Sequence, residues 1–326
     1  MYKIFFIFLG VTLGLFACSQ KSYDVKYKKG DNPLYVKHPA TKFAIMSDLH
    51  FYDTILGKDG KAFEDYIDND RKLLIESEEI LDKAIEKISA EDVDFVIIPG
   101  DLTKDGEEIN HKKVAEKLAK LKQSGKKVFV INGNHDLLNG HSLRYVNDSK
   151  ERVETTDREE FMEFYKDFGF GDAIDQDKES LSYVFEPVEG LWFLAMDSCM
   201  WYKNDLDEEP VVDGEFRQST VTWIESVLQK ANKENKALLG MMHHGALEHY
   251  NSNEKYYGEY VVNRNEEIIK LFAAYGLNFV FTGHFHSQDI VSKKLKNGSF
   301  LYDIETGSLV THPCPYRIIN ISERSE

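Results

Sequence analysis

The sequence predicts an α/β fold in which short buried strands alternate with amphipathic helices. Two observations predict it. Six short runs rich in β-branched and aromatic residues are bounded by Gly, Pro or polar residues, which is typical of buried strands. Between these runs, apolar residues recur three and four positions apart, which is typical of helices. The sequence therefore indicates an α/β sandwich with at least one mixed sheet.

The predicted elements follow one another in this order. Strands are expected at 43–46, 93–98, 128–131, 192–196, 237–242 and 278–282. Helical spacing is found over 73–88, 114–121, 161–168, 221–228 and 268–273. Outside those helices, residues 137–190 and 197–220 are richer in charge and show no clear strand alternation. We expect these two regions to form loops or an excursion around the mouth of a site.

Each predicted strand runs into a residue of a type that binds metals. In open α/β sheets, ligands bind at the carboxyl ends of the strands, so these side chains are expected to meet at one edge. Their carboxylate, amide and imidazole donors are enough for two divalent cations. The residues that follow the six strands are Asp48 and His50, Asp101, Asn134 to Asp136, Asp197, His243 and His244, and His284 and His286.

The composition of the chain limits which other classes of function are expected. The chain has 326 residues, 56 acidic and 40 basic side chains, and a formal net charge of −16. No basic patch with interleaved aromatic residues is present, so binding to a nucleic-acid duplex is not expected. The length is at the upper limit of a single domain.

The first eighteen residues predict a secretory signal. Residues 4–17 are almost wholly apolar, and this run is shorter than the roughly 20 residues that span a bilayer. Its end, Leu-Phe-Ala-Cys at 15–18, resembles a bacterial lipobox, in which Cys18 carries the lipid. We expect an extracytoplasmic, membrane-anchored protein with a signal at 1–18, a tether at 19–40 and a folded domain at 41–326. An ordinary signal peptide or an anchoring helix is the alternative.

Two further cysteines, Cys199 and Cys314, set no disulfide framework. In an oxidising compartment they could pair, but two free thiols fit the sequence equally well.

Five motifs in order resemble those of the calcineurin-like metallophosphoesterases. The resemblance covers roughly residues 41 to 317, and it implies a four-layer αββα sandwich with two mixed β-sheets and a two-metal centre. The segment 306–317 also resembles the closing strands of the cyclic-nucleotide-phosphodiesterase-type members. The motifs are Asp48-x-His50, Gly100-Asp101, Gly133-Asn134-His135-Asp136, His243 and Gly283-His284-x-His286.

The resemblance also implies roles for single residues. One metal would be held by Asp48, His50, Asp101 and His286, and the other by Asp101, Asn134, His243 and His284. This mixed donor set suits Mn, Fe or Zn better than Mg or Ca. A hydroxide bridging the metals would attack phosphorus, His135 would serve the leaving group, and Asp136 would orient His135. His243 is favoured over His244 as the ligand, although Gly245 stands where the family has Pro.

The predicted function is hydrolysis of small phosphodiesters of the nucleotide or glycerol type. We expect no C-terminal domain of the 5′-nucleotidase type after the last motif. A broad phosphomonoesterase and a non-catalytic surface-binding lipoprotein are the alternatives, and the oligomeric state is left open. Asp197 is expected at the site edge or in a structural role, and His111, His141, His249 and His312 match no motif.

Overall fold

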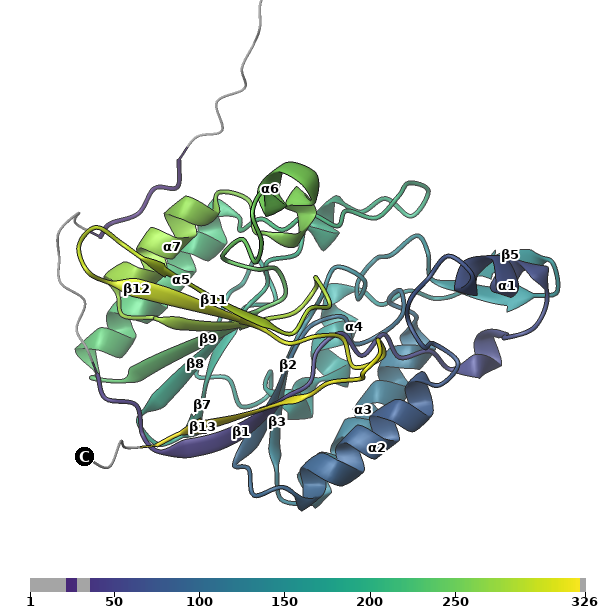
Figure 1. Ribbon diagram of the computed structural model, residues 1–326, viewed down its shortest axis with the longest axis horizontal. Helices are drawn as coiled ribbons and strands as arrows, with labels where there is room; N and C mark the ends of the chain where they lie inside the picture. The colour runs from purple at the N-terminus through teal and green to yellow at the C-terminus, as the bar shows by residue number, and fades with distance from the viewer. Residues whose placement is uncertain (1–21, 28–35, 323–326) are drawn as a thin grey trace, which may run out of the picture.

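The computed structural model describes residues 22–27 and 36–322, and Figure 1 shows their arrangement. Two sheets pack face to face, and helices cover the outer face of each sheet. The predicted four-layer αββα sandwich with two mixed sheets is therefore confirmed.

The first sheet has the strand order β13-β1-β2-β3. Strands β1 (Thr41–Ile45), β2 (Phe95–Pro99) and β3 (Lys127–Ile131) are parallel, and β13 (Arg317–Ile321) pairs antiparallel with β1. Helices α2 (Ser77–Ala90) and α3 (Glu108–Gln123) lie on its outer side, as Figure 1 shows.

The second sheet has the order β11-β12-β10-β9-β8-β7-β6. Its parallel centre contains β8 (Leu191–Met196), β9 (Ala237–Met242), β10 (Phe279–Thr282) and β12 (Phe300–Glu305). Antiparallel pairing adds β7 (Tyr183–Val188) and β6 (Asp175–Gln176) on one side and β11 (Asp289–Lys294) on the other. Helices α5 (Gln218–Lys233) and α7 (Asn265–Ala274) cover the outer face.

Aromatic side chains join the two sheets. Phe43 stacks on Phe95 within the first sheet at 4.7 Å between ring centroids, and it meets Phe281 of the second sheet at 5.3 Å. Phe129 stacks on Phe185 across the same interface at 3.7 Å. Each buried phenylalanine side chain contributes about 1.5–3 kcal/mol, so these contacts hold the two sheets together.

A small lobe lies beside the sandwich. It consists of α1 (Lys61–Ile67) and the hairpin of β4 (Leu143–Val146) and β5 (Ser149–Arg152), with its own apolar cluster that includes Phe63 and Tyr145. The remaining short helices are α4 (Arg158–Phe164), α6 (Asn253–Tyr256), η1 (Thr54–Leu56), η2 (Lys166–Phe168), η3 (Trp201–Lys203) and η4 (Gly258–Tyr260).

One expectation is wrong. Residues 137–190 do not form only loops around one helix, because β7 lies inside the second sheet between β6 and β8. The alternation that identifies half-exposed strands is missing because both faces of β7 are covered. Phe185 packs in the inter-sheet core, whereas the neighbouring Val184 packs in the cluster under α5 and α7.

Part of the predicted tether contacts the domain. The Tyr23 hydroxyl donates to the Phe216 carbonyl at 2.8 Å, and the Lys26 amide donates to the Glu225 carboxylate at 2.8 Å. The predicted signal at 1–18, with Cys18, lies outside the described residues. Within residues 22–27 and 36–322, no helix has the length and apolar character needed to cross a membrane.

Cys199 is buried and Cys314 is partly exposed, and both are free thiols. Of the two alternatives for these cysteines, the structure therefore has the unpaired one.

Candidate metal centre

The candidate ligands lie at the carboxyl ends of parallel strands from both sheets. Two groups of side chains in the described residues could each hold a metal ion, and within each group the donor atoms lie within 4.8 Å of one another. Asp101 belongs to both groups. The first group is Asp48, His50, Asp101 and His286, and the second is Asp101, His243 and His284.

The backbone at these residues is unusual. Five of the candidate ligands have a positive φ, a conformation that costs a residue other than glycine about 1–2 kcal/mol. Strain of this kind clusters at functional sites, where the surrounding structure holds it in place. The values of φ are 52° for Asp48, 36° for His50, 49° for Asp101, 71° for His284 and 60° for His286.

Glycines precede three of these ligand segments because no side chain fits there. A Cβ atom at Gly133 would lie 2.1 Å from the Asp101 Oδ1 atom, and one at Gly283 would lie 2.4 Å from the Asp48 Oδ2 atom. Gly100 has a φ of +103°, and a Cβ there would lie 2.6 Å from the His243 ring. The three motif glycines therefore let the backbone approach the donor atoms closely.

The first group converges on one point. The Nε2 atoms of His50 and His286 are 3.1 Å apart, and the His286 Nε2 atom lies 3.3 Å from the Asp48 Oδ1 atom. The His50 Nε2 atom also lies 3.5 Å from the Asp101 Oδ2 atom. Two imidazole nitrogens and two carboxylates directed at one another fit a divalent cation, which would accept all four lone pairs.

The second group is oriented by backbone carbonyls. A carbonyl only accepts, so the His243 Nδ1–H group donates to the Pro99 oxygen at 2.9 Å, which leaves the Nε2 lone pair free. That Nε2 atom lies 3.0 Å from the Asn134 Oδ1 atom and 3.3 Å from the Asp101 Oδ2 atom. The His284 Nε2–H group donates to the Glu259 oxygen at 3.2 Å in the same way. Metal-binding histidines characteristically donate their second N–H to such an acceptor.

His244 is not directed at this centre. Its Nδ1 atom bonds to the Ser198 hydroxyl at 2.8 Å, and its Nε2 atom to the Val212 carbonyl at 2.9 Å. Burial, with a smaller contribution from His243, lowers its pKa to about 3. Of the adjacent pair, His243 is thus the residue that faces Asp101.

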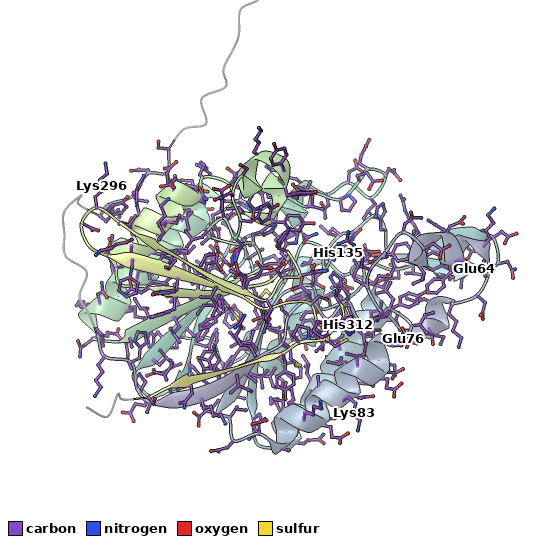
Figure 2. All side chains as sticks on the ribbon, in the orientation of Figure 1. Glu64, Glu76, Lys83, His135, Lys296 and His312 are labelled. Atoms are coloured by element: carbon purple, nitrogen blue, oxygen red, sulfur yellow. The ribbon has the colours of Figure 1, made fainter. Side chains whose placement is uncertain are left out.

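His135 lies on the rim of the candidate metal centre, and its position in the molecule is labelled in Figure 2. Its Nδ1 atom lies 2.7 Å from the Asp105 Oδ1 atom, and its side chain is 24% exposed. Burial disfavours the imidazolium, but Asp101 and Asp105 outweigh that effect, and the pKa of His135 is raised. The Nε2 atom, 4.0 Å from Asp101, remains available to a bound molecule.

The expectation that Asp136 orients His135 is wrong. Its carboxylate accepts hydrogen bonds from the backbone amides of Leu102, Thr103 and Gly133 at 2.8–3.1 Å. The tight turn that starts at Gly133 directs the Asp136 side chain back under the ligand loop. Asp105 holds His135 instead. The signal for Asp105 was a second carboxylate four residues after Asp101, in the same strand-end segment.

A buried cation supports Asp105. The Lys104 ammonium is fully buried, contacts the Asp105 carboxylate, and lies 3.7 Å from the Glu107 Oε1 atom and 4.5 Å from the centre of the Tyr66 ring. Burial opposes ionisation of Asp105, but Lys104 and His135 outweigh it, so the pKa of this carboxyl is lowered. Asp105 is therefore kept as an anion behind His135.

A second cation, also missed from the sequence, faces the centre from the segment between α1 and α2. The side chain of Lys72 is only 11% exposed, and its Nζ atom lies 3.4 Å from the Asp70 Oδ2 atom. Burial lowers the pKa of His50, and the Lys72 ammonium lowers it further. Lys72 thus places a positive charge near His50, with Asp70 as its ion-pair partner.

The other polar residues noted in the sequence lie outside the two groups. Asp197 is buried and accepts from the Trp201 Nε1–H at 2.8 Å and the Asn132 amide at 2.9 Å, which is a structural role. His111 is buried against Tyr165, His141 lies near Glu209, and His312 is exposed. His249 lies among Asp289, Asp303 and Glu305.

Known proteins share the family and the fold of this chain. A family model described as calcineurin-like phosphoesterase matches residues 41–288. The crystal structure of a dimetal phosphatase from Danio rerio superimposes with a TM-score of 0.60 at 15% sequence identity, over 88% of this chain and 94% of that chain. A second solved structure superimposes with a TM-score of only 0.45 at 9% identity, over 86% of this chain and 95% of that chain. No curated protein matches the chain significantly.

Proposed function

This chain belongs to the calcineurin-like phosphoesterase family, and on that premise we propose that it hydrolyses small phosphodiesters with the help of two metal ions. The observation that carries the proposal is the sharing of Asp101 by two donor groups, with His135 on the rim beside them. A carboxylate between two cations is the arrangement used for displacement at phosphorus.

The residues present have separable tasks in this reaction. Two metal ions at such a centre would activate a water molecule and neutralise charge on the phosphoryl oxygens. Asn134 contributes a neutral amide oxygen, which limits the negative charge that an anionic ester meets. Lys72 adds a positive charge near His50.

His135 is the proton donor in this proposal. The water oxygen releases one proton to solvent and forms a new bond to phosphorus, the bond from phosphorus to the ester oxygen breaks, and that oxygen takes a proton from the His135 Nε2 atom, which is later replaced from solvent. The products are an alcohol and a phosphomonoester. Asp105 fixes the ring through Nδ1 and stabilises its protonated form, which keeps the acid charged before the bond breaks.

Two arguments support a diester over a monoester. The first is the resemblance of the segment 306–317 to the cyclic-nucleotide-phosphodiesterase-type members. This segment packs on the ligand loop, where the Ser308 hydroxyl donates to the Asp48 carbonyl at 2.9 Å. A diester also carries less negative charge than a monoester, so it approaches a protein of net charge −16 more easily.

The test compares two chromogenic esters on the same metal-loaded sample. The chain without residues 1–18 is supplied with Mn²⁺, and turnover of bis(4-nitrophenyl) phosphate and of 4-nitrophenyl phosphate is measured beside metal content. We expect diester turnover with about two metals per chain. Monoester turnover alone would replace this proposal with the phosphomonoesterase. Two bound metals without turnover of either ester would favour the non-catalytic lipoprotein.

We further propose that Cys18 anchors the protein to an extracytoplasmic membrane surface through a lipid. The Leu-Phe-Ala-Cys sequence at 15–18 supports this. Cells expressing the wild type and Cys18→Ser are grown with radiolabelled fatty acid. Label on the wild type alone is expected, and equal labelling of both would contradict the proposal.

A further inference from the structure

Four aromatic side chains form a cluster beside the second donor group. Tyr250, Tyr257, Tyr260 and Phe285, here called the aromatic shelf, come from the segment around α6 and η4 and from the loop after β10. Within the described part of the chain, none of them belongs to the three apolar cores. Core packing is therefore not their role.

The shelf is continuous with the candidate metal ligands. The ring centre of Tyr260 lies 4.7 Å from that of His284 and 4.8 Å from that of Phe285. Tyr250 meets Phe285 at 5.2 Å, and Tyr257 lies 6.3 Å from Tyr260. Phe285 itself stands between the ligands His284 and His286 in the chain.

Backbone bonds fix the shelf relative to the centre. The Gly245 amide donates to the Tyr260 carbonyl at 2.9 Å, and the Val262 amide donates to the Gly245 carbonyl at 2.9 Å. The Glu259 carbonyl accepts from the His284 ring at 3.2 Å. The segment that carries the shelf is thus attached directly to the residues after β9 and to a candidate ligand, so its distance from the centre is set.

The shelf is also open to solvent. Tyr257 is 51% exposed, and Tyr250, Tyr260 and Phe285 are each partly exposed. Single exposed apolar residues are common, but contiguous exposed apolar groups mark binding sites. Aromatic faces favour other planar rings, whose stacking on them is strong and needs no hydrogen-bond pattern.

We propose that the aromatic shelf stacks the planar ring of the ester group, so that this site takes nucleotide esters in preference to glycerol esters. The inference rests on the proposed function for the phosphate half of the ligand. In a nucleotide one ribose separates the phosphate from the base, so we expect a phosphate held beside His284 to direct its base toward Tyr260, whose ring centre lies 4.7 Å from that of His284, and toward Tyr257, 6.3 Å beyond Tyr260. A glycerol ester has no ring to place there.

Equilibrium binding tests the inference without turnover. Affinities of the Mn²⁺-loaded protein for adenosine 5′-phosphate and for glycerol 3-phosphate are measured by calorimetry for the wild type, Tyr257→Ala, Tyr257→Phe and Tyr302→Ala. Tyr302 is a matched control because it is 37% exposed but stacks on Phe279, away from the shelf. Turnover of bis(4-nitrophenyl) phosphate is recorded on the same samples.

The wild type is expected to bind the nucleotide about tenfold more tightly than the glycerol ester. Tyr257→Ala should bring this ratio close to one, whereas Tyr257→Phe and Tyr302→Ala should keep it. Equal affinities in the wild type would overturn the inference, and so would an equal loss of the ratio in Tyr257→Ala and Tyr302→Ala. A nucleotide preference without diester turnover would support the shelf while rejecting the proposed function, so the two can fail separately.

Discussion

The ligand edge of the two sheets and the mouth above it are built in different ways. At the ligand edge, short loops directly after the strands hold side chains that are mostly buried, and five of the residues have a left-handed backbone. At the mouth, longer connecting segments carry Lys72 and the three tyrosines of the aromatic shelf, whereas His135 and Phe285 extend to it from the ligand loops themselves, and all of these side chains are at least partly exposed. The difference separates two tasks. The loops after the strands position the candidate metal ligands, and the residues of the mouth determine which molecules bind beside them.

The largest effect is expected from Asp101→Asn, which breaks the ligand edge. Both donor groups lose their shared carboxylate, so metal content should fall from about two per chain to near zero. Turnover should fall by more than about 100-fold. Elemental analysis and diester kinetics on the purified variant check this, and a variant that keeps both metals would show that Asp101 is not shared.

His135→Ala removes a group of the mouth and leaves the ligand edge intact. Turnover should fall by about 10²- to 10⁴-fold, the usual loss for a general acid. Metal content should stay near that of the wild type. If the variant lost its metal, His135 would be a metal ligand and not a group of the mouth.

Asp105 and Asp136 are both buried carboxylates near His135, but they are expected to differ in their tasks. Asp105→Asn should lower turnover by about 10- to 100-fold, because the ring loses its anionic partner. Asp136→Ala should lower the free energy of unfolding by about 3 kcal/mol or more, because three backbone amides lose their acceptor. Kinetics and urea unfolding of the two variants measure both effects. The reverse pattern would return the orienting role to Asp136.

The smallest effect is expected from a substitution of His249, the residue before Tyr250 of the aromatic shelf. His249 has Asp289 at 3.1 Å, Glu305 at 3.5 Å and Asp303 at 3.6 Å. Burial alone would lower its pKa, but Asp303, Glu305 and Asp289 raise it to about 9. Because this lies above the ordinary value of 6.5, the stabilisation is complete below pH 6.5 and is lost as the pH rises through 9.

His249→Gln should therefore lower the free energy of unfolding by about 1–2 kcal/mol at pH 6 and by almost nothing at pH 10. Urea unfolding at the two pH values gives the difference between wild type and variant. A difference that grows with pH would mean that His249 is neutral in the folded protein.

The sequence predicts the ligand edge better than the mouth. Asp48, Asp101 and His284 follow their strands within three residues, so a local pattern locates them. The bond between Asp105 and His135 joins loops that follow different strands, β2 and β3, and only the sheet brings those loops together. Tyr257 and Phe285 meet through Tyr260 in the same way, from segments nearly thirty residues apart. Strand β7 could not be predicted from the sequence, because both of its faces are covered and the polar alternation that identifies a half-exposed strand is absent.

Anomalous diffraction from a crystal grown with Mn²⁺ would show whether two metal ions lie on either side of Asp101. We expect two anomalous peaks roughly 3.5–4 Å apart, one near His50 and His286 and the other near His243 and His284. A single peak, or two peaks that do not share the Asp101 carboxylate, would contradict this expectation.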